Sequence, residues 1–320
     1  LAFPTETVYG LGADALDEEA SAKIYAAKGR PSDNPLIVHI ADIEALYKLS
    51  CEVPDKALKL ADKFWPGPLT MILKKSDIVP DSITGGLGTV AIRMPSHKVA
   101  AELIRTSGVY IAAPSANTSG KPSPTRASHV IKDLSGKIDM IIEDDTVDIG
   151  VESTIIDLSE EVPTILRPGY ITKEMFEEVI GGVRIDPAIT EGVKSGVVPK
   201  APGMKYKHYA PDAELKIVEG DEAKVVEYIN DNVNRLISQG YKVAVMTTEE
   251  GKHNYNKGII VSMGHKDDEL SAARHLYAVL REFDNENVDY VFSESFETDN
   301  VGRAVMNRLI KAAGHTIINV

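Results

Sequence analysis

The first forty residues alternate short apolar runs with polar turns, a pattern typical of an α/β protein. Residues 1–3 predict a strand that stops at Pro4, because proline has no amide proton to donate to a strand ladder. Asp17 opens an acidic first helical turn, an apolar stripe follows, and Gly29 fits a C-terminal cap. Residues 36–40 form the next buried strand. This order predicts a strand, helix and strand unit, with polar residues at a strand end, where open α/β sheets hold ligands.

The same alternation continues to about residue 183. Apolar residues at helical spacing predict helices over 55–64, 99–106, from about 127, and 173–180. Short apolar runs predict strands over 69–73, 90–94, 109–113, 140–142 and 154–158. The polar, proline-containing run from 114 to 125 is predicted to be a loop. We therefore assign residues 1–183 to one α/β domain.

A second domain follows a change of composition. Residues 184–211 contain several prolines and glycines without apolar periodicity, and they predict a linker. Beyond it, predicted strands over 214–218, 242–247, 258–263 and 290–292 alternate with predicted helices over 223–238, 268–283 and 302–313. This alternation favours a smaller, mostly parallel α/β domain over residues 212–320.

Composition narrows the class of protein. A chain of 320 residues with 43% hydrophobic content can bury two ordinary cores. It has no run of about 18 apolar residues and does not open with a targeting segment, so we expect a cytoplasmic protein. The single cysteine, Cys51, excludes an internal disulfide and a Cys-rich zinc site. Because Leu1 falls inside a predicted strand, we expect an upstream strand and helix.

The net charge of -13 argues against a broad basic surface for nucleic acid, so a phosphate site must be built locally. The run Gly10 to Ala15 fits a dinucleotide fingerprint superficially. We reject that interpretation because Pro4 interrupts the strand, and because Asp14 and the acids at 17–19 would repel a pyrophosphate. No phosphate-binding P-loop motif occurs in the sequence.

Local cations offer another way to hold phosphate. Lys28 and Arg30 at a helix end merely complement the helix dipole in the simplest interpretation. In a parallel sheet, however, they would face the same edge as the polar residues after Pro4, and Arg93 and Arg167 would complete a ring of positive charge.

Several polar residues have both an ordinary and a functional interpretation. His39 in a strand is more often a packed histidine than a ligand, and turn chemistry alone explains Ser115 and Asn117. No Ser-His-Asp order or nucleophile elbow surrounds Ser115 or Ser153. The run 205–209 is aromatic and basic, and we treat it as a candidate lid over a bound nucleotide.

Seven short motifs occur in one order and resemble a known family. They are Phe3 to Gly12, Lys28 to Pro31 with Asn34 to Leu36, Trp65 to Pro68, Arg93 to Pro95, Ala113 to Asn117, Glu152 to Thr154, and Leu166 to Gly169. The set resembles the YrdC-like threonylcarbamoyl-AMP synthases, and the run 202–211 resembles the linker of their long, two-domain form. The resemblance implies a twisted mixed-sheet α/β domain with a concave, positively charged cavity, followed by a Rossmann-like α/β domain.

The resemblance also implies a reaction. L-Threonine and bicarbonate (or CO₂) give a carbamate whose oxygen attacks the α-phosphate of ATP, forming threonylcarbamoyl-AMP and pyrophosphate, usually with Mg²⁺. This is a nucleotidyltransferase activity, and its product is used by other proteins that modify a tRNA adenosine. The implied partners are these small molecules and the downstream tRNA threonylcarbamoyl-transferase proteins, without strong direct nucleic-acid binding or a membrane.

Site residues follow from the resemblance, position by position. The implied contacts to L-threonine are Thr7, His39, Arg93, Ala113 and Ser153, with Arg93 taking a carboxylate. The implied contacts to ATP are Lys28, Arg30, Asn34, Thr89, Ser115, Ser123, Arg167, His208 and Tyr209, the last two closing over the site from the linker. No general base and no protein metal ligand is assigned.

One alternative from another class remains. Concave basic surfaces in related domains could hold double-stranded RNA, which would make the chain a non-enzymatic RNA-binding module. The net charge of -13 counts against this alternative.

Overall fold

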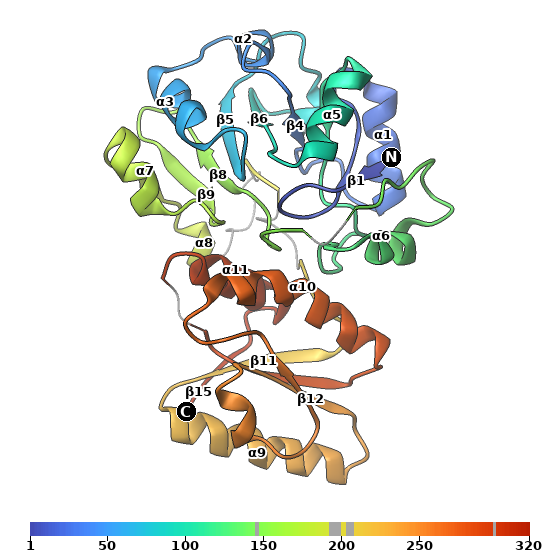
Figure 1. Cartoon of the computed structure of the whole chain (residues 1–320), viewed down its shortest axis with the longest axis vertical. Coiled ribbons are helices and arrows are strands. Elements are labelled where there is room, and N and C mark those ends of the chain that lie inside the picture. The colour runs from blue at the N-terminus through green and yellow to red at the C-terminus, as the bar shows by residue number, and fades with distance from the viewer. Residues whose placement is uncertain (145–146, 192–199, 203–207, 297–298) are drawn as a thin grey trace. The chain divides into compact units, whose positions relative to one another are not determined.

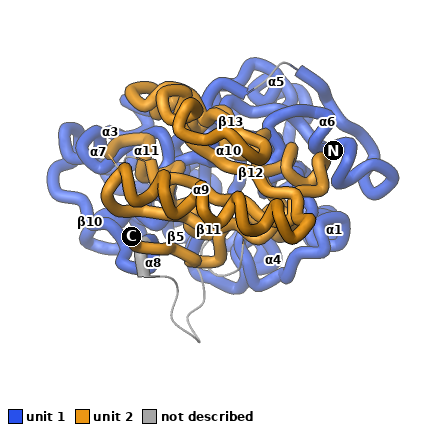
Figure 2. Tube along the Cα trace, turned by 90° about the horizontal axis from the view of Figure 1, so that it is seen from below, with its two compact units in different colours: residues 1–119, 123–206 blue, residues 120–122, 207–320 orange. Residues whose placement is uncertain are grey.

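The chain forms two compact units, which we describe separately. The computed structural model describes residues 1–320 except 145–146, 192–199, 203–207 and 297–298 (Figure 1). One unit comprises residues 1–119 and 123–206, and the other comprises 120–122 and 207–320 (Figure 2). Parts of the predicted linker 184–211 and of the predicted lid 205–209 therefore lie outside the described residues. The described start of that linker forms the short strand β10 (Arg184–Ile185) and the short helix α8 (Ala188–Glu191).

The first unit is built on a mixed sheet. Its described residues form eight strands in the order β10-β9-β8-β5-β6-β4-β7-β3. The other seven strands are β3 (Ala13–Asp14), β4 (Ile37–His39), β5 (Leu69–Lys74), β6 (Thr89–Arg93), β7 (Ile111–Ala112), β8 (Thr154–Asp157) and β9 (Thr164–Arg167). Three of its described pairs are parallel (β4 with β6, β5 with β8, β9 with β10) and the other four are antiparallel, which confirms the mixed α/β prediction.

The first strand does not lie in this sheet, so the predicted strand, helix and strand unit does not form. β1 (Ala2–Phe3) pairs antiparallel with β2 (Gly10–Leu11) in a separate two-stranded sheet. Pro4 ends the strand, and the hydroxyl of Thr5 then stabilises a tight turn by donating to the Val8 carbonyl (2.7 Å). The chain returns along its own first strand because this turn reverses it.

Helix α1 (Glu18–Lys28) confirms the predicted caps. Asp17 accepts from the Glu19 and Ala20 amides, and Gly29 ends the helix at φ +61°, which favours glycine. The prediction for α3 (Asp55–Phe64) and α7 (Lys173–Ile180) was also correct to the residue. The remaining helices of the unit are α2 (Ala45–Leu49), α4 (Asp81–Thr84), α5 (Lys98–Ser107) and α6 (Ala127–Leu134).

The two faces of the mixed sheet have different apolar layers. Val38, Met71 and Ile92 pack on one face into the large core of the unit. The opposite face carries Ile37 and Ile72 in a smaller apolar cluster. Because side chains alternate along a strand, the residues two positions beyond Ile37 and two before Ile72 belong to this second face as well. The candidate site is built there.

The second unit contains a parallel sheet, as predicted. Its strands lie in the order β13-β12-β14-β11-β15, and every described pair is parallel. They are β11 (Glu214–Glu219), β12 (Val243–Thr247), β13 (Ile259–Ser262), β14 (Tyr290–Glu294) and β15 (Ile317–Asn319). Figure 1 shows helix α9 (Glu222–Ser238) on one face of the sheet, and α10 (Glu269–Asn285) with α11 (Gly302–Ala312) on the other. Within the described residues, no helix is long and apolar enough to span a membrane.

Candidate active site

A row of polar side chains crosses one face of the mixed sheet. His39 in β4 lies opposite Arg93 in β6, and Arg93 lies opposite Thr70 in β5. Thr70 lies opposite Ile155 in β8, which in turn lies opposite Arg167 in β9. Residues that are register partners share a face. Strand pairing therefore brings together two arginines and a histidine from three separate parts of the sequence.

Arg93 is held rigidly at the centre of this row. Its Nη2 lies 2.7 Å from Glu6 Oε1, and its Nη1 donates to Thr7 Oγ1 at 3.0 Å. All three side chains are buried. Burial raises the pKa of Glu6, but the charge and hydrogen bonds of Arg93 outweigh it and bring the pKa below its ordinary value. Arg93 Nε is buried and has no hydrogen-bond partner among the described residues, so it remains available as a donor.

His39 is a neutral imidazole. Burial, followed by the nearby charge of Arg93, lowers the pKa of His39 to about 3. Its Nδ1 lies 3.1 Å from the Ile37 carbonyl, and its ring meets Phe3 edge-on at 6.1 Å between centroids. Ala113 packs in the same apolar cluster as Phe3, and its amide donates to Ile37. The histidine can therefore exchange hydrogen bonds, but it adds no positive charge to the site at neutral pH.

Ser153 joins the row to Arg167. Its hydroxyl lies 2.7 Å from Thr70 Oγ1 and accepts from Arg167 Nη2 at 3.1 Å. Arg167 Nε also donates to the Ser153 carbonyl at 3.1 Å, and Nη1 donates to the Pro202 carbonyl at 3.4 Å. These contacts fix the plane of the guanidinium, which is buried.

Lys28 at the end of α1 stabilises the loop that follows β7. Its ammonium group is buried and donates to the carbonyls of Ser115 and Asn117, the latter at 2.5 Å. The Ser115 hydroxyl donates to Asn117 Oδ1 at 2.5 Å. The lysine was predicted as a phosphate ligand, and in the structure it also positions the two polar residues of this loop.

Arg30 supports the next polar segment. Its Nη2 donates to the carbonyls of Asn34 (3.3 Å) and Pro35 (3.2 Å). The side chain of Asn34 is buried, and its Oδ1 has no hydrogen-bond partner among the described residues. Thr89 lies half-buried at the start of β6, opposite Lys74.

The remaining predicted residues belong to different parts of the structure. Ser123 is buried and donates to Glu152 Oε1 at 2.5 Å within the first unit. His208 and Tyr209 belong to the second unit, where Tyr209 is buried and its ring lies 5.3 Å from that of Tyr277. Their closure over a nucleotide stays a prediction.

The second unit also holds residues 120–122, which lie between Asn117 and Ser123 in the sequence. Lys121 pairs with Asp212 (2.6 Å) and Asp284 (3.1 Å). The buried guanidinium of Arg281 in α10 donates to the Pro122 carbonyl from Nε (3.1 Å) and Nη2 (2.6 Å). Residues 121 and 122 of the predicted loop 114–125 are therefore held in the second unit by its own side chains.

Sequence reasoning assigned no role to Glu6, Thr70 or Glu152. Each is the direct partner of a predicted residue: Glu6 of Arg93, Thr70 of Ser153, and Glu152 of Ser123. Two of them left a signal, since Glu6 and Glu152 are acids within largely apolar segments. An acid that folding buries requires a charged or hydrogen-bonding partner.

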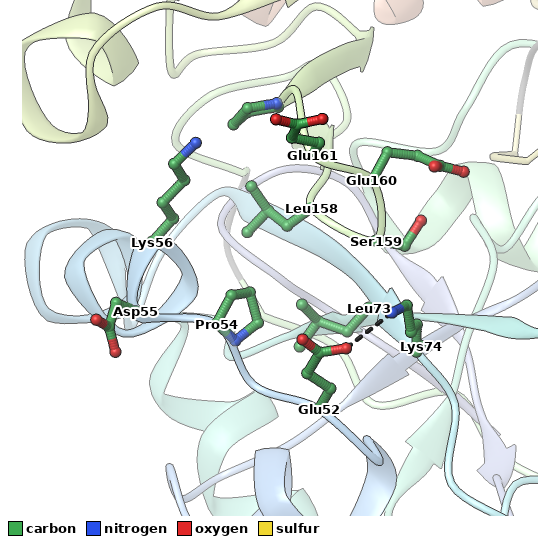
Figure 3. A pocket seen from close by; sticks show the side chains of 11 residues that line it. Glu52, Pro54, Asp55, Lys56, Leu73, Lys74, Leu158, Ser159, Glu160 and Glu161 are labelled. Atoms are coloured by element: carbon green, nitrogen blue, oxygen red, sulfur yellow. Dashed lines mark hydrogen bonds and ion pairs between the residues drawn. The ribbon is translucent and has the colours of Figure 1, made fainter.

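A surface cleft elsewhere in the first unit has a different character. It measures about 350 Å³ and lies between the start of α3 and the strands β5 and β8 (Figure 3). Four acids and two lysines line it, and one of those lysines, Lys74, pairs with Glu52 at 2.8 Å. None of the predicted site residues lines this cleft.

Fold and site together define a two-domain α/β protein whose first domain carries a buried, arginine-containing polar site. Comparison with known families identifies the family to which the chain belongs. A family model described as "Telomere recombination" (Sua5_yciO_yrdC) matches residues 1–169. A second, described as "Threonylcarbamoyl-AMP synthase, C-terminal domain", matches residues 171–314. The chain belongs to the Sua5/YrdC family in its two-domain, threonylcarbamoyl-AMP synthase form, which confirms the resemblance seen in the sequence.

Similar proteins come from archaea, bacteria and fungi. The threonylcarbamoyl-AMP synthase of Pyrococcus abyssi is 52% identical over 100% of this chain and 92% of its own length. That of Bacillus subtilis is 50% identical over 99% of this chain and 90% of its own. The crystal structure of P. abyssi Sua5 complexed with L-threonine has a TM-score of 0.93 and 51% identity, covering 100% of this chain and 92% of that one.

Proposed function

We propose that the chain is a nucleotidyltransferase that makes threonylcarbamoyl-AMP from L-threonine, bicarbonate or CO₂, and ATP, with release of pyrophosphate. The observation that carries the proposal is the buried Arg93, which is oriented by Glu6 and Thr7 and keeps a donor at Nε. Guanidinium groups bind carboxylates with planar, charge-assisted hydrogen bonds. The names of the relatives, which share half of its sequence over nearly the whole chain, support the same activity.

L-Threonine would lie on the polar face of the mixed sheet. Its carboxylate would accept from Arg93, and Thr7, Ser153 and neutral His39 would offer hydrogen bonds to its polar groups. Ala113 would contact the threonine methyl group through its own methyl in the apolar cluster. Ligand binding would then satisfy the buried Arg93 Nε donor, which is otherwise costly to leave unpaired.

ATP would be bound by the polar segments at the edge of this site. Lys28, Arg30 and Arg167 would neutralise phosphate charge, and the buried Asn34 Oδ1 would accept a donor from the nucleotide. Ser115, Ser123 and Thr89 would contribute hydroxyl groups, and His208 and Tyr209 would cover the nucleotide. Mg²⁺ would enter with ATP as part of the substrate, because it binds readily to nucleotide phosphates.

The chemistry needs alignment more than a strong base. The threonine amino group first combines with bicarbonate or CO₂ to give a carbamate. A carbamate oxygen then attacks the α-phosphorus of ATP, the bond to the bridging oxygen breaks, and pyrophosphate leaves. Fixed arginines would hold the reactants in line and stabilise the charge on the leaving pyrophosphate. We assign no general base.

The product would pass to tRNA threonylcarbamoyl-transferase proteins in the cytoplasm, for the modification of a tRNA adenosine. The alternative, a non-enzymatic module for double-stranded RNA, has no support among the relatives, and the net charge of -13 disfavours it.

Analysis of the nucleotide products tests the proposal. The chain is incubated with Mg·ATP, bicarbonate and, separately, each of the twenty amino acids. We expect an AMP-linked product and an equal amount of pyrophosphate with L-threonine alone. Equal product formation with several amino acids, or none with threonine, would refute it.

A further inference from the structure

Thr70 lies in the middle of the polar row, and the proposed substrate contacts do not include it. It is a buried residue of β5, opposite Arg93 in β6. Its Oγ1 lies 2.7 Å from Ser153 Oγ, which also accepts from Arg167 Nη2 at 3.1 Å. In the described part of the chain, the hydroxyls of Thr70 and Ser153 make no other hydrogen bond. The row therefore contains a buried pair of hydroxyls linked to one guanidinium.

This pair of hydroxyls has one proton that the protein does not use. Each hydroxyl has one proton and two acceptor positions, and one proton forms the hydrogen bond between Thr70 and Ser153. The other proton has no acceptor among the described residues, although both side chains are buried. A buried donor without an acceptor is costly, so a ligand that supplies an acceptor gains this free energy.

The surroundings of Ser153 favour this residue as the donor of the unused proton. Arg167 bonds to both its carbonyl and its hydroxyl, so positive charge lies beside Ser153 and attracts an anionic acceptor. Ser153 also lies just outside β8, which begins at Thr154, whereas Thr70 has a paired strand on each side. If Thr70 donates to Ser153, it fills with Arg167 both acceptor positions of Ser153, and the Ser153 proton is directed away from them.

The acceptor should be a negatively charged oxygen of the substrate. Two strands separate β6 from β9, which puts the Cα atoms of Arg93 and Arg167 roughly 14 Å apart at about 4.8 Å per strand. The two arginines are therefore suited to opposite ends of one small ligand, and the carboxylate of L-threonine is assigned to Arg93. On the other side of Arg93, neutral His39 and the methyl of Ala113 offer no positive charge. The carbamate on the threonine nitrogen is the remaining anionic group for the Ser153 end.

We propose that Thr70 is a positioning residue that acts through Ser153: it donates to the Ser153 hydroxyl and so directs the Ser153 proton at an oxygen of the threonine carbamate. This role rests on the proposed function, and it defines a binding site for the group that bicarbonate or CO₂ supplies. Thr70 thus favours binding of the carbamate without contributing to the affinity for threonine itself.

The experiment separates bicarbonate from threonine. Pyrophosphate release is measured against bicarbonate concentration in CO₂-free buffer, at saturating threonine and Mg·ATP. Thr70→Val, which keeps the shape and the β-branched character of the side chain, should raise KM for bicarbonate at least fivefold. The calorimetric Kd for threonine should change less than twofold, which also shows that the variant is folded. Thr70→Ser, which restores a hydroxyl, should return KM for bicarbonate to within about twofold of the wild type.

A mutational cycle tests whether Thr70 acts through Ser153. In the Ser153→Ala background, Thr70→Val should cause no further rise in KM for bicarbonate, because the hydroxyl that Thr70 orients is absent. The matched control is Thr164→Val, at a half-buried position in β9 of the same sheet but outside the polar row, which should change neither constant. Thr70→Ala serves as a second hydroxyl-free variant if Thr70→Val does not fold.

The wild type distinguishes two kinds of failure. Absence of threonine-dependent pyrophosphate release would refute the proposed function, and this role of Thr70 with it. With an active wild type, three results would each overturn the role of Thr70 alone: an unchanged KM for bicarbonate in Thr70→Val, an equal loss of threonine affinity, or additive effects of Thr70→Val and Ser153→Ala.

Discussion

The two sheets of this chain carry opposite kinds of polar site. On the mixed sheet, Arg93, His39 and Arg167 are buried, and their neighbours hold them in place. At the edge of the parallel sheet, acids face a cleft and close the starts of three helices. In the proposed function, phosphate recognition depends on side-chain cations of the first unit, whereas acids already accept hydrogen bonds from the helix starts of the second unit.

Gly12, which belongs to the rejected dinucleotide fingerprint, also has a role other than phosphate binding. A Cβ atom at Gly12 would lie 2.6 Å from Ile111 Cγ2 and 2.8 Å from Phe3 Cε1, so packing requires glycine there. Helix α1, which follows, begins with Asp17 accepting from its first amides. The rejected dinucleotide fingerprint is thus explained by close packing and an acidic helix cap.

The largest expected effect comes from removing the central arginine. Arg93→Ala should lower kcat/KM for threonine at least 10³-fold, because it deletes the carboxylate ligand. It should also destabilise the fold by about 3 to 5 kcal/mol, since Glu6 would remain buried without its partner. Pyrophosphate release and urea unfolding measure the two effects. The matched control is Arg105→Ala, which removes an exposed arginine of α5 and should change neither. Wild-type activity in Arg93→Ala would show that the buried row is merely structural.

The next largest effect is expected from a variant that distinguishes the proposed phosphate site from the proposed threonine site. Arg30→Ala should abolish threonine-dependent adenylate formation, with the fold and the affinity for threonine intact, because Arg30 is proposed to bind phosphate and is not among the proposed threonine contacts. Lys23→Ala, an exposed position on the preceding helix, serves as the control. Analysis of the reaction products measures adenylate formation, and calorimetric titration measures the affinity for threonine. Normal turnover in Arg30→Ala would remove this residue from the phosphate site.

The accuracy with which the sequence predicted the fold differs between the two units. Strong periodicity and clear caps predicted α1, α3 and α7 correctly, as well as the parallel sheet of the second unit. The pairing of β1 could not be predicted in the same way, since a two-residue strand carries no information on its partner. Strand β9 (Thr164–Arg167) and strand β15 (Ile317–Asn319) were not predicted either.

For the candidate site, residue types were predictable and contacts were not. Arg93 and Arg167 were predicted to be anion ligands from their chemistry and position, and the structure places both in the buried row. Their alignment in one row depends on strand order, which places β5 between β6 and β8 and follows from tertiary packing. The supporting residues Glu6 and Thr70 become evident only when this order is known.

Acid should weaken the first unit in particular. The pKa of His39 is about 3 when folded, against an ordinary value of 6.5, so between these values the unfolded state binds one more proton. Stability should therefore fall as the pH drops below 6.5, by up to about tenfold in the folded-to-unfolded ratio per pH unit. Trp65, the sole tryptophan in the sequence, reports unfolding of this unit by fluorescence. His39→Gln should flatten the dependence and exposed His253→Gln should not. The explanation fails if both variants keep the wild-type slope.

The most direct test of the central claim compares two ligands that differ in one group. L-Threonine carries the carboxylate that buried Arg93 is proposed to bind, and L-threoninamide replaces it with a neutral amide. In calorimetric titrations of the wild-type chain, threonine should bind at least 30-fold more tightly than threoninamide, as expected for a charged hydrogen bond worth about 2 kcal/mol. In Arg93→Gln this preference should disappear. Equal binding of the two ligands to the wild type would contradict the account.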